Sequence, residues 1–435
     1  MKTPFLDDVR RWYHSRLAVI LESVFIGFLA GLVVVLFRHL VGLADVWRRR
    51  LYGALFFLPL SRTLLWALCL AVVGLFLGWA ARVRPMIRGS GIPQIKGVLK
   101  REMRFDWRTE LPLKFITGVL GLGAGLSLGR EGPSIQIGAY TGRVVLGFLR
   151  RPYRERRILI TAASAAGLAA AFNAPLAGVL FVLEELNTGF TPLAIACSMG
   201  AAVAADAVAG FFFGFVPVFD FSNVGVLPLR VFPWIALLGI CCGLLGVLFK
   251  KSLYLSQDLY AKFRVPLPLR PLVPLLVSVP LGFYFFDITG GGHGIIESLP
   301  EGGRTAVFVL LLLAMKIVFT ALCYGSGTSG GIFLPLLACG ALSGELLSLL
   351  LSRADFLSPG QNTAFIILGM AAFFTAAVNA PVTGIILILE MSGSFNHLFS
   401  LVLVCLSAFV TTALMGSRPV YDVLFERLSG SLRRT

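Results

Sequence analysis

Three glycine-rich segments interrupt apolar stretches of this sequence, and each combines residue types suited to holding an anion. They are GSGIPQ at 89–94, GREGPS at 129–134 and GSGTSGGIFLP at 325–335. Glycine lets the backbone turn tightly and approach a ligand closely, and proline fits the first turn of a helix, where an N–H would have no partner. The unpaired N–H groups and positive dipole end of such a helix favour an anion. One break alone is more typical of a packing kink, but three together predict an anion site.

The donors at these breaks can be named from the sequence. Ser90 adds a hydroxyl to the first segment, and Ile332 and Phe333 offer backbone N–H groups in the third. Two other kinds of glycine-rich site are excluded. A P-loop needs Lys followed by Ser or Thr after its last glycine, and GLGAGL at 121–126 lacks the third glycine of a dinucleotide site.

An acid stands in the second segment, where a helix is expected to begin. We expect the Glu131 carboxylate to be able to occupy the anion site itself and to leave it when protonated. The plainer alternative is a negative charge that only complements the helix dipole. The neighbouring Arg130 is more typical of a structural residue, although its charge also raises the local potential for anions.

Two adjacent acids, Glu184 and Glu185, end the apolar run NAPLAGVLFVL. Negative charge near a helix C-terminus opposes the helix dipole, and neighbouring acids disfavour joint ionisation, so at least one of them is a candidate for proton binding. A solvated helix end is the alternative. A further acid within an apolar run, Asp206, is most simply interpreted as a structural hydrogen-bonding group.

These groups must be positioned by membrane helices. Of the 435 residues, 57% are hydrophobic and only 14% charged, and the mean hydropathy is +0.86, whereas a soluble protein carries about 25% charged residues. Many apolar runs reach the roughly 20 residues that a helix needs to cross a bilayer. Glycine and proline, with 47 and 22 residues, interrupt several of them. The composition predicts an all-α polytopic membrane protein with broken or re-entrant helices.

The net charge of +16 does not indicate nucleic-acid binding, because the bases cluster beside the apolar runs as juxtamembrane charge does. The seven cysteines form no CxxC pair and the four histidines form no cluster, so no metal or other cofactor is expected.

An intramembrane hydrolase would need HExxH or a nucleophile with a histidine base. Because none of the four histidines stands in such a context, we do not expect the protein to be an enzyme. The N-terminus lacks the features of a cleaved signal peptide, and the 17 residues after Arg418 leave no room for a soluble C-terminal domain.

An internal repeat divides the single membrane domain, residues 1–435. NAPLAGVLFVLE at 173–184 matches NAPVTGIILILE at 379–390 at an offset of 206, and four residues at 133–142 match four at 335–344 at an offset of 202. We predict halves at 15–216 and 232–430, with a substrate site at their interface, as in many secondary transporters. The repeat gives Glu184 a counterpart in Glu390, whereas Glu185 is matched by Met391. An acid at 185 is therefore particular to the first half.

The three segments, in this order and at these separations, resemble the signature of the CLC family of chloride channels and transporters. The resemblance runs from about residue 15 to the C-terminus and includes RPVYD at 418–422. It implies two inverted-topology repeats with about eighteen helices, and a homodimer in which each subunit has its own pore. It also implies an integral protein of the lipid bilayer. The absence of a soluble C-terminal domain favours a prokaryotic inner membrane.

By this resemblance, Ser90 and Tyr421 hold chloride, with backbone amides at Ile332, Phe333 and around Glu131 completing the site. Glu131 is then the gate and the external proton carrier. Taken alone, Tyr421 is more typical of a residue at the membrane interface.

Some positions depart from the pattern, or refine it. Gln94 stands where relatives often have glutamate, and Thr328-Ser329 stands where many have proline, so we expect altered rate or gating there. Serine at position 90 favours chloride, since nitrate-preferring relatives have proline and fluoride exporters methionine.

The resemblance makes Glu185 the internal proton-transfer residue of an exchanger, with Glu184 as the second candidate. The expected function is exchange of chloride for protons. The alternatives are a passive chloride channel on the same scaffold, in which position 185 is usually hydrophobic, and a transporter of another small anion.

Overall fold

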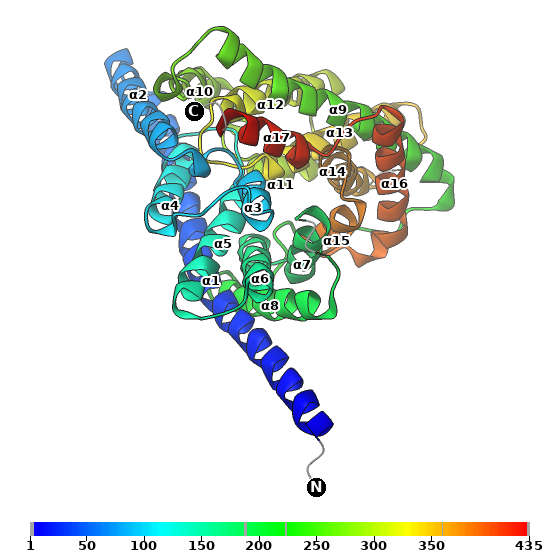
Figure 1. Ribbon diagram of the computed structural model, residues 1–435. Helices are drawn as coiled ribbons and strands as arrows, with labels where there is room; N and C mark the ends of the chain where they lie inside the picture. Colours follow the sequence, from blue (N-terminus) through cyan, green and yellow to red (C-terminus); the bar gives the residue numbers. More distant parts are fainter. Residues whose placement is uncertain (1–3, 187–188, 222–223, 359, 433–435) are drawn as a thin grey trace.

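The computed structural model describes residues 4–186, 189–221, 224–358 and 360–432 (Figure 1). Within these ranges the chain forms 17 α-helices and six short 3-10 helices, and no β-strand. The α-helices are α1 (Pro4–Leu55), α2 (Leu60–Val83), α3 (Ile92–Leu99), α4 (Trp107–Gly123), α5 (Glu131–Phe148), α6 (Tyr153–Phe172), α7 (Pro175–Glu185), α8 (Pro192–Phe213), α9 (Phe232–Lys262), α10 (Leu272–Tyr284), α11 (His293–Ser298), α12 (Ala306–Gly325), α13 (Phe333–Arg353), α14 (Asn362–Val378), α15 (Pro381–Ser392), α16 (Leu398–Leu414) and α17 (Val420–Leu432). The 3-10 helices are η1 (Pro85–Ile87), η2 (Leu229–Val231), η3 (Leu267–Leu269), η4 (Phe286–Ile288), η5 (Leu299–Glu301) and η6 (Phe395–His397).

Eight helices of the described chain are long and apolar enough to cross a bilayer. The first of them belongs to α1, which extends beyond the body of the molecule at its N-terminal end (Figure 1). The prediction of an all-α polytopic membrane protein is confirmed. The eight stretches are Arg16–Leu55, Leu60–Val83, Pro192–Phe213, Leu229–Lys262, Leu267–Tyr284, Ala306–Gly325, Phe333–Arg353 and Phe395–Leu414.

The centre of the molecule is formed by two equivalent helix pairs, α5 with α6 and α13 with α14. Their facing surfaces are glycine and alanine, so the backbones come into direct contact. A Cβ on Gly138 would lie 2.3 Å from the carbonyl oxygen of Ala163, and a Cβ on Gly340 would lie 2.4 Å from that of Gly369. The glycines that match between the two halves of the sequence therefore lie where the paired helices pack backbone against backbone.

The repeated helices α7 and α15 lie side by side and cap each other (Figure 1). The Glu184 carboxylate, near the C-terminal end of α7, accepts from the backbone N of Thr383 at 2.9 Å and from its hydroxyl at 2.6 Å. In return, Glu390 near the end of α15 accepts from the backbone N of Leu176 at 3.0 Å and of Ala177 at 2.7 Å. The end of each helix meets the start of the other, so these equivalent helices run antiparallel. This is the relation expected of inverted repeats, while the limits 15–216 and 232–430 stay a prediction.

The reciprocal caps lead to a prediction about stability. Replacing Glu390 with alanine removes a charged acceptor from two backbone donors at the start of α7, which costs about 1–3 kcal/mol of the free energy of unfolding. Thermal unfolding in detergent should show a lower midpoint for Glu390→Ala and for Glu184→Ala. The matched control is Glu426→Ala, which removes an exposed acid paired with Arg418 on the surface and should shift the midpoint little. A midpoint for Glu390→Ala equal to the control's would contradict the structural role of the caps.

Candidate functional site

The three glycine-rich segments of the sequence meet in space and are joined by backbone hydrogen bonds. Gly89 donates to the carbonyl of Thr328 at 2.9 Å and accepts from Gly330 at 3.0 Å. Gly129 and Gly331 exchange two hydrogen bonds, each of 2.7 Å. Because 129 and 331 are equivalent positions of the repeat, this mutual pair lies where a two-fold axis between the halves would pass. The starts of α3, α5 and α13 are thereby held at one place.

A buried lysine binds the backbone at the first glycine-rich segment, GSGIPQ. Lys114, on α4, donates to the carbonyl of Ile87 at 3.0 Å and to that of Gly89 at 2.7 Å, and its side chain is fully buried. Carbonyls freed by the glycine turn are satisfied in this way inside the protein, as a break within a membrane requires.

The same arrangement recurs in the second half, at a segment that the sequence reasoning missed. Lys316, on α12, donates to the carbonyl of Ile288 at 3.0 Å and to that of Gly290 at 2.8 Å. The GGGHG segment at 290–294 is thus the structural counterpart of GSGIP. An offset of 201–202 relates these residues to Ile87, Gly89 and Lys114, so extending the repeat search would have found it.

Ser90, Ile332 and Phe333 all lie at this junction and are buried. The Ser90 hydroxyl accepts weakly from the backbone N of Ile92, at 3.4 Å. A Cβ on Gly132 would lie 2.8 Å from the Cβ of Ser90, which places the first segment directly against the start of α5. Ile332 and Phe333 begin α13, where the first N–H groups have no partner within the helix. The predicted anion donors are therefore neighbours.

The Glu131 side chain is buried at the same junction and reaches the start of α13. A Cβ on Gly129 would lie 2.2 Å from Glu131 Oε2 and 3.1 Å from the backbone N of Leu334. Neither carboxylate oxygen has a hydrogen-bond partner in the described part of the chain. The nearest cation is Arg130, whose Nε lies 3.9 Å from Glu131 Oε1. A buried acid without hydrogen bonds is costly, so this position is one where protonation or exchange with another anion lowers the free energy.

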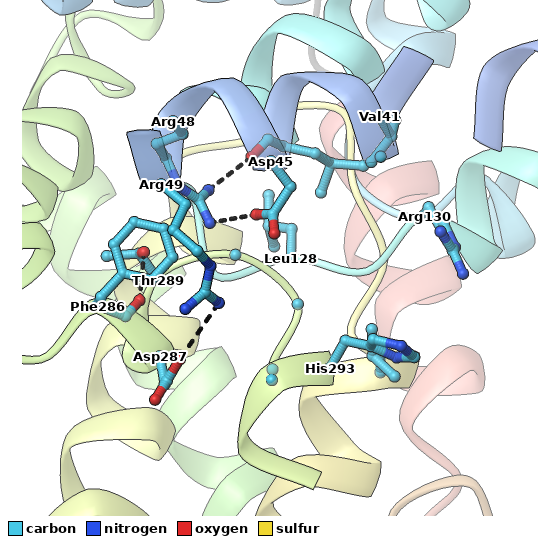
Figure 2. A pocket seen from close by; sticks show the side chains of 17 residues that line it. Val41, Asp45, Arg48, Arg49, Leu128, Arg130, Phe286, Asp287, Thr289 and His293 are labelled. Atoms are coloured by element: carbon cyan, nitrogen blue, oxygen red, sulfur yellow. Dashed lines mark hydrogen bonds and ion pairs between the residues drawn. The ribbon is translucent and has the colours of Figure 1, made fainter. Parts of the chain in front are cut away.

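A pocket of ≈ 160 Å³ lies close to this carboxylate, and Arg130 and Leu334 are among the residues that line it. In Figure 2, Arg130 and His293 lie on one side of the pocket, and Arg48 and Arg49 lie on the other. Three guanidinium groups around one opening raise the local potential for anions. The pocket thus has an electropositive lining, and Arg130 lies between it and Glu131.

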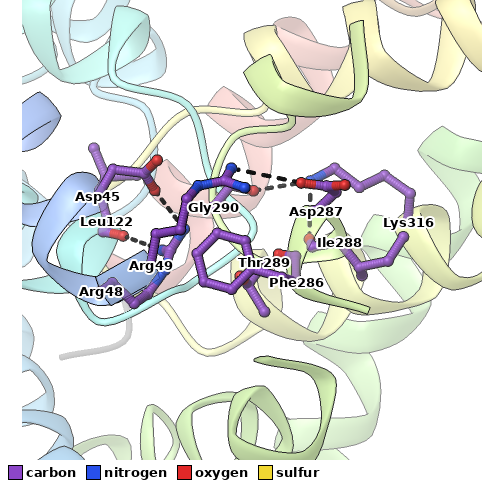
Figure 3. A network of polar contacts seen from close by, with 10 residues as sticks. All are labelled: Asp45, Arg48, Arg49, Leu122, Phe286, Asp287, Ile288, Thr289, Gly290 and Lys316. Atoms are coloured by element: carbon purple, nitrogen blue, oxygen red, sulfur yellow. Dashed lines mark hydrogen bonds and ion pairs between the residues drawn. The ribbon is translucent and has the colours of Figure 1, made fainter. Parts of the chain in front are cut away.

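The far side of this pocket is fixed by a network of polar contacts (Figure 3). Arg48 pairs with Asp45 and donates to the carbonyl of Leu122 at 3.2 Å. Arg49 lies 3.6 Å from Asp287. Both guanidinium groups stack on the Phe286 ring. These pairs hold the arginines in place and offset part of their charge, whereas the Nε of Arg130 has no hydrogen-bond partner among the described residues.

Tyr421 approaches the junction from α17. Its side chain is fully buried, and its hydroxyl has no partner within the described ranges. The ring packs edge-on against Phe181, at 6.3 Å between centroids, and Phe181 in turn contacts Phe333 at 5.9 Å. An unpartnered buried hydroxyl is a free donor for a ligand. The structure therefore places Tyr421 one aromatic ring away from Phe333.

Glu185 lies apart from this group and is held by a lysine that the sequence reasoning did not single out. Lys96 Nζ is 2.6 Å from Glu185 Oε1 and also 2.6 Å from Asp422 Oδ1. Lys96 belongs to α3, which follows Ser90, and Asp422 follows Tyr421 in α17. The sequence separations of 89 and 326 residues left no local signal for this pairing.

The remaining residues singled out in the sequence differ in their hydrogen-bonding partners. Glu184 is engaged as the cap of α15. The buried Oδ1 of Asp206 has no hydrogen-bond partner in the described part of the protein, and a structural role for this acid stays a prediction. Gln94 donates to the carbonyl of Arg88 at 2.6 Å. Thr328 and Ser329 form the backbone contact with Gly89, so this departure from the family pattern lies in the junction itself.

Comparison with known proteins agrees with this geometry. A family model described as voltage gated chloride channel, the CLC family, matches residues 73–413. This chain belongs to the CLC family. An H(+)/Cl(-) exchange transporter, ClcA of Vibrio cholerae serotype O1, is 37% identical over 432 residues, which cover 94% of this chain and 89% of the relative. ClcA of Salmonella paratyphi B, with the same description, is 34% identical over 441 residues, covering 97% and 91%.

Solved CLC structures share the fold. A slow cyanobacterial Cl-/H+ antiporter superposes with a TM-score of 0.88 at 29% identity, covering 95% of this chain and 98% of that one. A CLC-type fluoride/proton antiporter superposes with a TM-score of 0.78 at 24% identity, covering 92% and 97%. The prediction of a CLC fold is confirmed. The chain is an integral, multi-pass membrane protein, and the curated relatives it matches are transporters.

The close contact between Gly132 and Ser90 yields a prediction. In Gly132→Ala the new Cβ would meet the Ser90 backbone oxygen at 2.9 Å as well as its Cβ, so α5 and the first segment must separate. We expect a loss of about 1–3 kcal/mol in stability, as for other overpacked sites, and weaker chloride binding measured by isothermal titration calorimetry. Gly147→Ala is the matched control, because its Cβ would enter open space on the same helix. Unchanged chloride affinity in Gly132→Ala would contradict the interpretation of this junction as the anion site.

Proposed function

We propose that this protein is a secondary active antiporter that exchanges chloride for protons. The observation that carries the proposal is the buried Glu131 carboxylate, which lies next to the start of α13 and has no hydrogen-bond partner among the residues that the structure describes. A carboxylate there competes with an anion for the same backbone donors. The names of the similar bacterial transporters support chloride and protons as the two substrates.

In this proposal the central chloride is held by four donors of two kinds. Ser90 and Tyr421 contribute hydroxyl groups, and Ile332 and Phe333 contribute backbone N–H groups at the start of α13. The hydroxyl of Tyr421 is free to donate, since no partner takes it within the described residues. The weak contact of 3.4 Å to Ile92 leaves the Ser90 hydroxyl available as well. All four donors are uncharged, so they bind chloride weakly enough for it to leave the site during transport.

Exchange follows from the competition at Glu131. While ionised, the side chain occupies the amide-lined position and excludes chloride. Protonation neutralises it, the side chain leaves, and chloride enters. Return of the carboxylate requires loss of the proton and displacement of the anion, so each movement of chloride is linked to a proton moving the other way. The electropositive pocket beside Arg130 supplies chloride to this position.

Glu185 is the internal proton-transfer residue in this scheme, passing protons between Glu131 and the cytoplasm on a route partly separate from the anion path. Glu184 has a structural task as the cap of α15. The second candidate function is a passive chloride channel. It is disfavoured by the buried acid at position 185, whose desolvation serves no purpose in a simple pore.

The wider setting belongs to the same proposal. The protein acts as a homodimer with one pore per subunit, in the inner membrane of a bacterium. It is a transporter and no enzyme, and it needs no cofactor, because the two ion gradients supply the free energy.

Glu131→Gln tests the gate. The amide cannot ionise, so chloride flux should persist, lose its dependence on pH, and no longer drive proton uptake. Both ions are followed together in proteoliposomes, with a chloride electrode and a pH electrode under an imposed chloride gradient. Proton uptake of normal size in Glu131→Gln would rule out the competition mechanism.

Glu185→Gln distinguishes exchange from a channel. The amide keeps the shape of the side chain but cannot carry a proton, so chloride flux should continue while proton uptake falls to background. Glu184→Gln, the adjacent control, should reduce coupling much less. If the unmodified protein moves no protons uphill under a chloride gradient, the channel alternative is correct. If Glu185→Gln pumps as well as the parent, the internal relay runs through another residue.

A further inference from the structure

Three ionisable groups from distant parts of the chain converge on the inner side of the anion junction. Lys96 Nζ lies 2.6 Å from Glu185 Oε1 and 2.6 Å from Asp422 Oδ1. The side chains of Lys96 and Glu185 are 6% and 5% exposed, whereas that of Asp422 is 38% exposed. One buried nitrogen is therefore shared by a buried acid and a half-exposed acid.

The charged groups near Glu185 come from three helices. Lys96 belongs to α3, Asp422 to α17, and Glu184 to its own helix α7. Glu184 is already engaged by the backbone and hydroxyl of Thr383. This leaves Lys96 as the group in direct contact with Glu185, and Asp422 as the acid next in line toward solvent.

A purely structural role explains this arrangement poorly. Taking an ammonium and a carboxylate out of water costs several kcal/mol, and apolar side chains of similar volume stabilise such a position as well or better. Surrounding helices supply ample apolar packing. Ionisable groups buried in membrane proteins are usually functional for this reason.

We propose that Lys96 and Asp422 form the inner part of the proton route, with Lys96 as the bridge between Asp422 and Glu185. The inference rests on the proposed exchange function and extends it by two residues. Asp422 takes up a proton from water at its exposed side. Lys96 passes the proton on, and Glu185 receives it.

The transfer is balanced in protons and charge. A proton leaves the Lys96 ammonium for Glu185 Oε1, and a proton from Asp422 Oδ1 restores the ammonium. The net change is one proton moved from Asp422 to Glu185, with Lys96 unchanged. Both hydrogen bonds are already formed at 2.6 Å, so the two steps can occur together without a neutral lysine accumulating.

Two substitutions at position 96 separate a proton bridge from a simple positive charge. Lys96→Arg keeps the charge and the donors, but a guanidinium does not release a proton in proteins. Lys96→Met removes both. We expect the proton uptake rate to fall by about 100-fold in either variant, the low end of the effect of a positioned proton-transfer group. Chloride flux and chloride affinity should stay close to those of the parent, because Ser90, Glu131 and Tyr421 are untouched.

Asp422→Asn provides an independent arm, which should also slow proton uptake while chloride binding persists. Each variant has a matched control four residues further along the chain. Lys100→Met, at the end of α3, matches Lys96→Met, and Glu426→Gln, on α17, matches Asp422→Asn. Both residues are exposed; Lys100 stacks on the Phe425 ring and Glu426 pairs with Arg418. Each control should exchange chloride and protons at the parental rate. All variants are measured in the full chain, reconstituted in liposomes under one chloride gradient.

The outcomes distinguish this inference from the function on which it rests. Normal proton uptake in Lys96→Arg, with loss in Lys96→Met, would reduce Lys96 to an electrostatic neighbour and overturn the bridge. Normal uptake in Asp422→Asn would remove Asp422 from the route. If Lys96→Met does not fold, Lys96→Arg and Asp422→Asn decide. Absence of proton uptake in the unmodified protein would refute exchange itself, whereas loss in the variants alone supports the bridge.

Discussion

The mutual hydrogen bonds between Gly129 and Gly331 are the contact on which the site depends. Each residue donates to and accepts from the other at 2.7 Å, as two residues related by a two-fold axis do. A Cβ on Gly331 would lie 3.1 Å from the backbone N of Gly132, so a larger residue there would push the two halves apart by a few tenths of an ångström. The contact brings the first N–H groups of α5 and α13 to one point, and these groups are what an anion or the Glu131 carboxylate can bind.

Breaks of this kind are costly inside a membrane, because each frees carbonyl groups that lipid cannot satisfy. Lys114 and Lys316 meet that cost, each donating to two carbonyls of its own half at 2.7–3.0 Å. The backbone of the site is thus stabilised by one buried lysine side chain in each half.

The sequence was sufficient for the helical membrane fold, the repeat and the residues at the three breaks, since glycine spacing and apolar length are local properties. It also separated Glu184 from Glu185, because only Glu184 has a repeat partner, and the cap on α15 agrees with that reasoning. The contact of Lys96 with Asp422 could not be predicted from the sequence. It joins positions 326 residues apart and follows no periodicity, so only the packing of α17 against α3 creates it.

The repeat also shows which residues are free to differ. Equivalent positions that maintain the scaffold are alike in both halves, as with Lys114 and Lys316. At the positions proposed for transport the halves differ in sequence. At the repeat offset of 202, Glu131 is equivalent to Phe333, and at an offset of 201, Lys96 is equivalent to Glu297. A symmetric scaffold would offer equivalent anion and proton paths from both sides of the membrane. In the proposed mechanism, the gate at Glu131 and the buried pair of Lys96 and Glu185 belong to the first half alone, so the two halves contribute different chemistry to the exchange.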